Sequence, residues 1–366
     1  MSSDNNRRVL IVGASGLIGT AALDEFAEHG WNVATLSRRR PALATTTDYQ
    51  HYSVDLDDRD AVAQLVSAEL SDVTHIVYTA VYEKPGLVAG WRDPEQMAKN
   101  RRMLVNLVDP LAAGGGLQHV SIMQGTKAYG VHIHPIPVPA RERFERDDHE
   151  NFYWLQEDYL KEAGTQAGFT WTIFRPTVVM GPNVGVAMNV LPVIGVYAAI
   201  AHETGQPFGF PSAMPYPREA VDVKLIAEAT RWAATEPAAA NQHFNLTNGE
   251  VFSWKDLWPD VSEVLGVEHS EVEPFSMAEE LPKHEELWQS IVDKHGLQAG
   301  SLGALLGESH HYADFCFGYG RTEPPAPMFV STVKVKEAGF NRVFDTSQRT
   351  RHWLEFLVER KVLPRF

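Results

Sequence analysis

Short apolar runs alternate with longer amphipathic stretches through the first half of the chain. Residues 9–12 form an apolar run, and between 17 and 29 apolar side chains recur three and four positions apart. These patterns are typical of a buried strand and of a helix with one apolar face. Further strands are expected at 31–36, 50–54, 73–79, 117–123 and 169–175, and further helices at 58–70, 94–111 and 151–167. This alternation predicts the α/β class, with a doubly wound parallel sheet and right-handed crossovers.

Beyond residue 180 the pattern becomes mainly helical. Helices are expected at 188–202, 222–234 and 254–265, with one further strand at 243–246. Residues 206–217 are rich in proline and glycine, which predicts an irregular or short-strand segment. Residues 268–307 are predicted to be helical and acidic.

A glycine-rich turn joins the first expected strand to the first expected helix, with the spacing Gly13-x-x-Gly16-x-x-Gly19. Strand, tight turn and helix in this order are the context that a dinucleotide-binding fingerprint requires. Gly13 permits the turn, Gly16 lets the backbone approach a pyrophosphate, and Gly19 lets the helix pack on the strand. The helix N-terminus adds N–H donors and a partial positive charge. The pattern indicates a dinucleotide site, with an ordinary glycine-rich turn between strand and helix as the alternative.

Three arginines stand at the end of the second expected strand, in Ser37-Arg38-Arg39-Arg40. Domains that prefer NAD usually have Asp or Glu at this place, whereas arginine accommodates the 2′-phosphate of NADP. A guanidinium can donate two parallel hydrogen bonds to a phosphate. The position therefore predicts NADP rather than NAD, with a solvated basic surface run as the alternative.

The chemistry is expected just after the fifth strand, because ligands of doubly wound sheets bind beyond the carboxyl ends of the strands. The segment at 124–130 contains Lys127, and a helix begins shortly before Tyr153. Short-chain dehydrogenases carry Tyr-x-x-x-Lys on this helix, but here the fourth residue after Tyr153 is Glu157. Lys127 is therefore the candidate cation for Tyr153.

This combination resembles the progesterone 5β-reductase/iridoid synthase-like family, an unusual branch of the short-chain dehydrogenases, and the resemblance covers nearly the whole chain. Beside the glycine turn, the motifs that carry it are Ser37-Arg38-Arg39, Gly125-Thr126-Lys127-x-Tyr129, Asn151-Phe152-Tyr153-x-x-x-Glu157-Asp158, Arg175-Pro176, Met188-Asn189, Val196-Tyr197-Ala198-Ala199-Ile200, Leu225-Ile226-Ala227-Glu228, Phe244-Asn245-x-Thr247-Asn248-Gly249-x-x-Phe252-x-Trp254-Lys255 and residues 331–340. The tyrosine segment and the Asn-Gly-x-x-Phe-x-Trp-Lys run are much more specific than the glycine turn.

The resemblance implies an extended short-chain dehydrogenase that reduces the activated C=C bond of enones or enals by 1,4-addition of hydride from NADPH. A neutral Tyr153 hydroxyl can hydrogen-bond the carbonyl oxygen, on which negative charge develops, and Lys127 would add positive charge. Tyr153 and Lys127 are thus the expected catalytic residues. The residues expected to bind NADPH are Gly13, Ser15, Gly16, Leu17, Ile18, Ser37, Arg38, Arg39, Asp55, Leu56, Ala80, Val81, Gln124, Tyr153, Pro176, Val179, Val186, Ala187 and Met188.

The expected substrate is a small hydrophobic enone or enal, in a pocket that includes Tyr129, Trp154, Met328 and Phe329. Two departures from the family affect this pocket. Trp154 stands where the family often has a second tyrosine, and Met328-Phe329 stands in the neighbourhood of an active-site aromatic. Both departures concern the identity of the substrate and not the type of reaction.

Residues 1–180 are expected to form the NADP-binding Rossmann domain. Residues 181–366 are expected to form mainly a smaller substrate-binding region, with 205–250 partly returning to the Rossmann core.

Two other functions stay open. One is an NADPH-dependent carbonyl reductase or epimerase-like extended dehydrogenase, which would need the motif that Glu157 interrupts. The other is a non-catalytic NADPH-sensing protein, against which the retention of Lys127 and Tyr153 speaks.

Composition narrows the class of protein further. The 366 residues carry a net charge of −15, which argues against nucleic acid as a partner. The single cysteine, Cys316, is expected to be a buried thiol in a reducing compartment. No apolar run is long enough to span a membrane and no signal peptide fits, so a cytoplasmic protein is expected, with a homodimer left open. His132-x-His134 has no evident third ligand, so no metal is expected.

Overall fold

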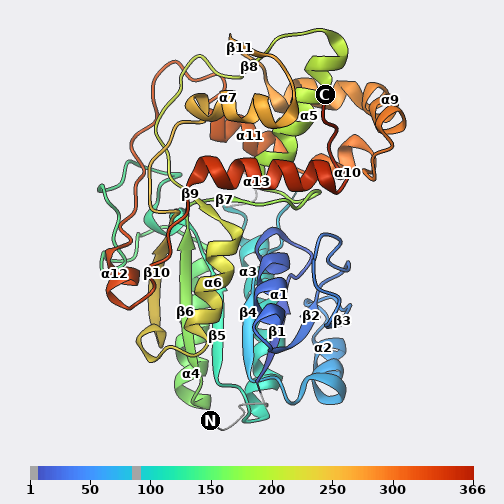
Figure 1. Cartoon of the computed structure of the whole chain (residues 1–366). Coiled ribbons are helices and arrows are strands. Elements are labelled where there is room, and N and C mark those ends of the chain that lie inside the picture. Colours follow the sequence, from blue (N-terminus) through green and yellow to red (C-terminus); the bar gives the residue numbers. More distant parts are fainter. Residues whose placement is uncertain (1–6, 85–91) are drawn as a thin grey trace.

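The computed structural model describes residues 7–84 and 92–366. A seven-stranded sheet forms one half of the molecule, and a mainly helical region lies above the carboxyl ends of its strands (Figure 1). The strands run in the order β10-β6-β5-β4-β1-β2-β3, and all neighbouring pairs are parallel. Their bounds are β1 (Arg8–Val12), β2 (Asn32–Leu36), β3 (Gln50–Tyr52), β4 (His75–Tyr78), β5 (His119–Met123), β6 (Thr170–Pro176) and β10 (Gln242–Leu246). The predicted doubly wound α/β fold is confirmed, and the strand expected at 243–246 is its β10.

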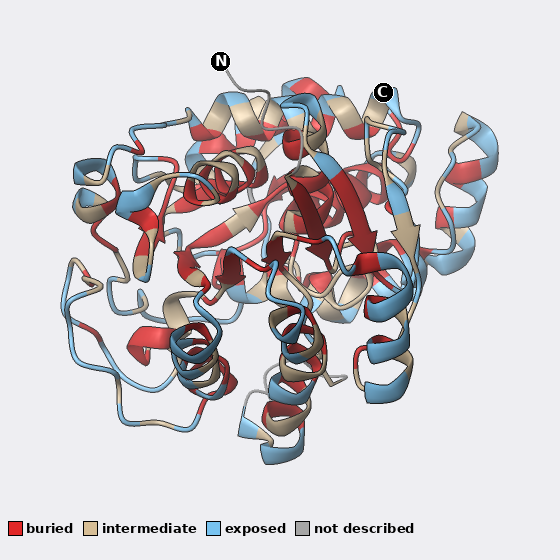
Figure 2. Cartoon of the chain, turned by 90° about the horizontal axis from the view of Figure 1, so that it is seen from below, coloured by how far each residue is buried: buried red, intermediate tan, exposed pale blue. Residues whose placement is uncertain are grey.

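Helices cover both faces of the sheet. The bounds are α1 (Leu17–Glu28) and α6 (Val223–Ala233) on one face, and α2 (Arg59–Leu65), its π-helical extension (Val66–Leu70), α3 (Pro94–Ala113) and α4 (Phe152–Ala167) on the other. Strand β1 explains these layers, because Val9 and Ile11 pack with α1 while Leu10 and Val12 pack with α3. Successive side chains of a strand point to opposite faces, so a sheet covered on both faces needs an unbroken apolar run. Figure 2 shows the buried strands and the exposed outer faces of the helices.

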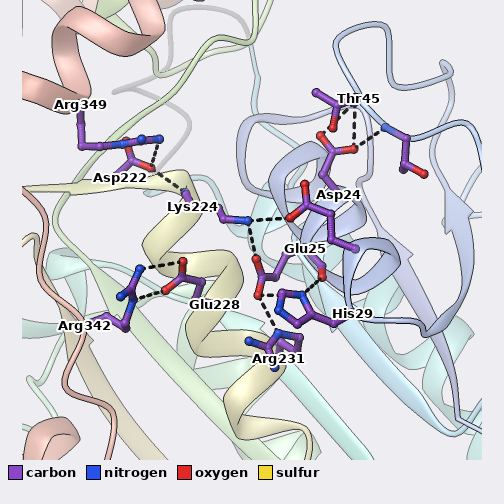
Figure 3. A network of polar contacts seen from close by, with 12 residues as sticks. Asp24, Glu25, His29, Thr45, Asp222, Lys224, Glu228, Arg231, Arg342 and Arg349 are labelled. Atoms are coloured by element: carbon purple, nitrogen blue, oxygen red, sulfur yellow. Dashed lines mark hydrogen bonds and ion pairs between the residues drawn. The ribbon is translucent and has the colours of Figure 1, made fainter.

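Ionic contacts hold α1 against α6. The Glu25 carboxylate, whose side chain is 1% exposed, accepts hydrogen bonds from Lys224 Nζ and Arg231 Nε, both at 2.6 Å (Figure 3). Burial by itself raises the pKa of Glu25, but these two cations outweigh it and hold the pKa below its ordinary value. Asp222, the N-cap of α6, in turn accepts a hydrogen bond from Arg349 of α13 (Thr346–Glu359) at 2.8 Å. This network fixes the start of α6 relative to both halves of the molecule.

The helical region is built around α5 (Val190–Thr204), in which residues 190–201 are all buried. A helix that is apolar on all sides belongs in a core, and large aromatic rings pack against this one. The other elements are β7 (Val178–Met180), β8 (Phe208–Phe210), β9 (Ala220–Asp222), α7 (Trp254–Leu265), β11 (His269–Val272), α8 (Met277–Glu280), α9 (Glu285–His295), α10 (Leu302–Leu306), α11 (Ser309–Phe317) and α12 (Val333–Glu337). Two short parallel pairs, β7 with β9 and β8 with β11, link them.

The prediction of helix throughout 268–307 is wrong at its beginning, where β11 pairs with β8. The two backbones approach so closely that a Cβ on Gly209 would lie 1.9 Å from the carbonyl oxygen of Glu271. A pairing partner so far away in the chain leaves no local pattern, which is why the strand was not predicted. Cys316 is buried, as expected. Among the described residues, no helix combines the length and the apolar character needed to cross a membrane.

Candidate functional site

A cavity of about 580 Å³ lies where the carboxyl ends of the strands meet the helical region. All of the residues that the sequence analysis expects to bind NADPH line this cavity. From the sheet and its loops these are Gly13, Ser15, Gly16, Leu17, Ile18, Ser37, Arg38, Arg39, Asp55, Leu56, Ala80, Val81, Gln124, Tyr153, Pro176 and Val179, and from the helical region Val186, Ala187 and Met188. The structure thus brings them together around one space, and their contacts with a cofactor stay a prediction.

The glycine turn has the geometry that its spacing predicts. Gly13 has a φ of +80°, and a Cβ on it would lie 2.7 Å from the amide nitrogen of Ala80. A Cβ on Gly19 would lie 2.4 Å from the carbonyl oxygen of Gly13, so the close packing of α1 on β1 requires glycine there. The N-cap of α1 is Gly16, and no side chain caps this end and no acidic residue stands in the first turn. The N-terminus of α1 is therefore available to an anion.

Two of the three arginines line the cavity at the end of β2. Ser37 Oγ donates a hydrogen bond to the carbonyl oxygen of Arg39 at 2.6 Å, which turns the chain after the strand. Arg38 and Arg39 line the cavity and are exposed, while Arg40 lies over the ring of Tyr49 with its Cζ 6.0 Å from the centroid. Two exposed guanidinium groups at this end of the cavity suit a phosphate group.

Tyr153 lies in the first turn of α4. Asn151 caps the helix, and its Oδ1 accepts a hydrogen bond from the Tyr153 amide at 3.1 Å. The Tyr153 hydroxyl lies against the loop after β5, since a Cβ on Gly125 would be only 3.2 Å from it. Burial raises the pKa of Tyr153, and the Glu83 carboxylate raises it further against the opposing effect of Arg175. The hydroxyl is therefore protonated at neutral pH and can donate a hydrogen bond.

The loop after β4 is held against α3 by two amide side chains. Asn100 Oδ1 accepts a hydrogen bond from the Tyr82 amide at 2.8 Å, and its Nδ2 donates to the Tyr82 carbonyl at 2.9 Å. Gln96 Oε1 accepts from the Lys84 amide, and its Nε2 donates to Glu83 Oε2 at 2.7 Å. These contacts place the Glu83 carboxyl group in the lining of the cavity.

Lys127 lines the same cavity, on a 3₁₀ turn (Thr126–Tyr129) that follows β5. Burial lowers the pKa of Lys127 to about 8, and attraction to Glu83 opposes this change. Burial likewise raises the pKa of Glu83, which Lys127 and Gln96 oppose. A cation, a carboxyl group and the Tyr153 hydroxyl are thus electrostatically coupled in one site.

Glu157 stands where other short-chain dehydrogenases have lysine, and it does not line the cavity. Its carboxylate is 3.2 Å from His243 Nε2 of β10, and it accepts hydrogen bonds from Lys161 Nζ at 2.6 Å and from Gln124 Nε2 at 3.1 Å. Burial by itself raises the pKa of Glu157, but these partners outweigh it and lower the pKa far below its ordinary value. Gln124 Oε1 also accepts a hydrogen bond from Arg175 Nε at 2.9 Å. Because Gln124 belongs to the loop that carries Lys127, its bond to Glu157 helps to hold this loop.

Two residues expected in the substrate pocket, Tyr129 and Trp154, do not line the cavity. The Tyr129 hydroxyl donates a hydrogen bond to Asn245 Oδ1 at 2.7 Å in the protein interior. Trp154 Nε1 donates to the carbonyl oxygen of His149 at 2.9 Å. The structure does not bring these two rings to the cavity, because the direction in which each ring points depends on partners from other segments.

Phe329 also lies outside the cavity lining, whereas Met328 belongs to it. The carbonyl oxygen of Phe329 accepts a hydrogen bond from the Ala140 amide at 2.8 Å, and Val330 forms a parallel bridge with Ala140. In such extended pairing, neighbouring side chains point in opposite directions. The backbone partner therefore decides between Met328 and Phe329, which the sequence left open.

Several cavity residues were not expected from the sequence. Glu83 follows a predicted strand at the correct edge of the sheet, so its position could have been inferred. Arg218, Tyr312 and Phe315 come from distant parts of the chain and carry no motif that indicates a site. They form a side of the cavity that only the folded chain defines.

The histidines considered for a metal have other partners. His134 Nε2 is 2.8 Å from Asp147 Oδ2, and the His132 ring lies edge-on to His149, with centroids 5.1 Å apart. In the described part of the chain, one group of potential ligand atoms lies close together, on Glu25, Glu28 and His29. Its buried carboxylate is the one that Lys224 and Arg231 neutralise, which disfavours a metal ion there.

This fold and site define the class of the protein. The chain belongs to the NAD dependent epimerase/dehydratase family, whose family model matches residues 9–247. A UDP-glucose 4-epimerase from Thermotoga maritima superposes with a TM-score of 0.69 at 15% identity, covering 96% of this chain and 99% of that one. A UDP-glucose 4-epimerase from Thermus thermophilus, solved in complex with NAD, gives 0.67 at 17% identity over 95% and 98% of the two chains. These similarities show the fold of an extended short-chain dehydrogenase.

Within this class the chain is a progesterone 5β-reductase/iridoid synthase-like protein, as the sequence resemblance predicted. It is 32% identical to an (S)-8-oxocitronellyl enol synthase from Camptotheca acuminata, covering 97% of this chain and 93% of that protein. It is 29% identical to the 3-oxo-Delta(4,5)-steroid 5-beta-reductase of Arabidopsis thaliana, over 97% and 92% of the two proteins. The chain is therefore an oxidoreductase of a dinucleotide-dependent family.

Proposed function

We propose that the protein reduces the activated C=C bond of enones or enals with NADPH. The observation that carries the proposal is that Tyr153 and Lys127 line one cavity, while Glu157, at the position of the usual lysine, is bound in an ion network outside it. The names of the relatives support the same chemistry, since a steroid 5β-reductase is among them. Carbonyl reduction through Tyr-x-x-x-Lys has no lysine to use at position 157.

The lining residues fit NADPH as the cofactor. The turn at Gly13 and the uncapped N-terminus of α1 suit a diphosphate, and Arg38 and Arg39 suit the 2′-phosphate. Pro176, the last residue of β6, and Val179 of β7 would hold the nicotinamide. When bound there, NADPH supplies the hydride.

The protein's own contribution is to bind and polarise the carbonyl group of the substrate. The Tyr153 hydroxyl donates a hydrogen bond to the carbonyl oxygen, on which negative charge develops as hydride adds to the β-carbon. A proton from solvent then adds to the α-carbon and completes the saturated carbonyl product. Lys127 adds a positive potential at the same place while it is protonated, which holds below a pH of about 8. Such interactions are strongest in a site shielded from water.

The cavity lining bears on the kind of substrate, and the cysteine content bears on the cellular compartment. Apolar side chains such as Met103, Met188 and Met328 line it, which suits a small hydrophobic enone or enal. The single buried cysteine is compatible with the reducing conditions of the cytoplasm.

The test is the loss of NADPH absorbance with 2-cyclohexen-1-one, progesterone and 8-oxogeranial, with the products identified by mass and chirality. A saturated carbonyl product is expected. An allylic alcohol would mean carbonyl reduction and would overturn the roles given to Tyr153 and Lys127. Binding of NADPH without turnover of any of the three compounds would favour the sensor instead.

A further inference from the structure

Arg218 is a cationic side chain of the cavity for which the proposed reaction gives no role. It lines the cavity, and the residue is 6% exposed. Its amide donates a hydrogen bond to the carbonyl oxygen of Phe252, and its own carbonyl accepts one from the Phe252 amide. Both backbone groups are engaged in this bridge, so the guanidinium is the polar group that Arg218 can offer to the cavity.

The guanidinium is held in place but has few hydrogen-bond partners. Its Nη1 donates to the carbonyl oxygen of Cys316, in the last turn of α11. Its Cζ lies 4.8 Å from the ring centroid of Tyr216 and 5.7 Å from that of Phe315. A guanidinium has five N–H donors, so most of its capacity is left over after the bond to Cys316.

No carboxylate within residues 7–84 and 92–366 forms an ion pair with Arg218. The adjacent Glu219 points elsewhere, since its Oε2 accepts a hydrogen bond from the Val330 amide at 2.9 Å. A buried cation without a counter-charge is costly, and buried charges in proteins are normally paired. The Cys316 carbonyl and the rings of Tyr216 and Phe315 compensate part of this charge, and an anion in the cavity would supply the counter-charge that no carboxylate provides.

The position of Arg218 separates it from the phosphates of the proposed cofactor. It stands two residues before Ala220, which pairs with Val178 just beyond β6, at the end where the nicotinamide is proposed to lie. The diphosphate and the 2′-phosphate are assigned instead to the N-terminus of α1 and to Arg38. Tyr312, Phe315 and Met328 line the cavity together with Arg218, and they suit a hydrocarbon chain. An anion carried by an otherwise apolar substrate fits this arrangement.

We infer that Arg218 binds a carboxylate group of the substrate. The preferred substrates are then enones or enals that carry an acid group, joined to the reacting carbons by an apolar chain. This inference rests on the proposed reductase function for the reaction, but the binding of the carboxylate can be measured without turnover.

The experiment compares 8-oxooct-6-enoate and its shorter and longer homologues with their methyl esters, in the wild type and in Arg218→Met. The wild type is expected to show a kcat/KM at least 10-fold higher for the best acid than for its ester. Arg218→Met is expected to lower this acid-to-ester ratio by about 10- to 100-fold, the size expected for a hydrogen bond to a charged group. Arg218→Lys keeps the charge but not the fork of donors, so its acid-to-ester ratio should lie between those of the wild type and Arg218→Met.

Arg321→Met is the matched control, because Arg321 is an exposed arginine close to Tyr216 that does not line the cavity. This variant should keep the wild-type ratio. Equal kcat/KM values for acids and esters in the wild type would overturn the inference. An unchanged acid-to-ester ratio in Arg218→Met would also overturn it. If that variant also had a lower melting temperature, Arg218 would serve only to support α11.

A binding measurement separates failure of this inference from failure of the proposed reaction. Octanoate and octan-1-ol are titrated into the wild type and Arg218→Met with NADP present, by calorimetry. Preferential binding of octanoate that is lost in Arg218→Met supports the carboxylate site even if no enal is reduced. Equal binding of both ligands contradicts it even if the reductase activity is found.

Discussion

Tyr153 and Lys127 respond to burial in opposite directions, and both responses suit the proposed reaction. Burial raises the pKa of Tyr153, so its hydroxyl keeps its proton, and lowers the pKa of Lys127 to about 8. Near neutral pH the site therefore holds a neutral donor and a cation together. Each stabilises negative charge that develops on a carbonyl oxygen.

Replacing Tyr153 by Phe removes the proposed donor and little else, because the ring can stay in place. We expect enone turnover to fall by roughly 10²-fold or more, the usual effect of losing one such donor, with NADPH affinity near that of the wild type. Tyr159→Phe is the control on the same helix, where the hydroxyl bonds Asp109 on the outer face. Full activity of Tyr153→Phe, measured by steady-state kinetics and NADPH titration, would contradict the assignment.

The charge of Lys127 predicts a pH dependence. A lysine with a pKa of about 8 is protonated below that pH, so kcat/KM should be constant at neutral pH and fall as the pH rises through about 8. The Glu83 carboxylate favours the protonated form of Lys127, so Glu83→Gln should move this fall to lower pH. A pH–rate profile of both proteins checks this. A wild-type profile without a fall near pH 8 would contradict the role of Lys127, and coincident profiles would contradict its coupling to Glu83.

How much of the site could be predicted depends on how far apart its residues lie in the chain. The turn at Gly13 and the arginines after β2 belong to contiguous strand–turn–helix units, whose geometry follows from local sequence. Tyr129 and Trp154 were expected in the pocket, but their polar atoms bond Asn245 and His149 in the folded protein. Arg218 could not be predicted, since its place in the cavity depends on long-range pairing and no local motif marks it.

At the scale of elements, buried ion networks hold the two faces of the sheet. Glu157 joins α4 to β10 and, through Gln124, to the loop after β5. Glu25 joins α1 to α6, from the other face (Figure 3). The helices themselves were predictable from apolar spacing, but these pairings were not, because an acidic residue on a helix usually faces solvent. The strand β11 was missed for a different reason, because its partner β8 is distant in the chain.

Glu25→Gln should destabilise the protein by about 1–3 kcal/mol, because it leaves Lys224 and Arg231 without their shared buried carboxylate. The folded-state pKa of Glu25 is lowered, so its contribution is full above the ordinary carboxyl pKa and is lost as the pH falls through the folded value. The difference from the wild type should therefore be largest at neutral pH and shrink in acid. Glu28→Gln, at the exposed partner of Lys224, should cost about 0–1 kcal/mol. Urea unfolding at several pH values measures both, and equal losses would show that burial of Glu25 is unimportant.

At the scale of the whole molecule, the cavity lies between two differently built halves. The sheet contributes Gly13, Arg38 and Tyr153, and the helical region contributes Met188 and Tyr312. A ligand that fills this space contacts both halves only when the chain is folded. Binding is therefore linked to the stability of the complete molecule and not to that of one half.

NADPH at about a hundred times its Kd should stabilise the folded protein by about 2.7 kcal/mol, because it binds the folded chain and not the unfolded one. For a chain of this size that corresponds to a rise in Tm of about 3–5 °C. NADH at the same concentration should give a smaller rise, since it lacks the 2′-phosphate that Arg38 and Arg39 are proposed to bind. Arg38→Ala should reduce the NADPH effect towards that of NADH, whereas Arg40→Ala, outside the cavity lining, should not. Thermal unfolding with each cofactor checks this, and equal stabilisation of Arg38→Ala and the wild type by NADPH would mean that Arg38 does not contact the 2′-phosphate.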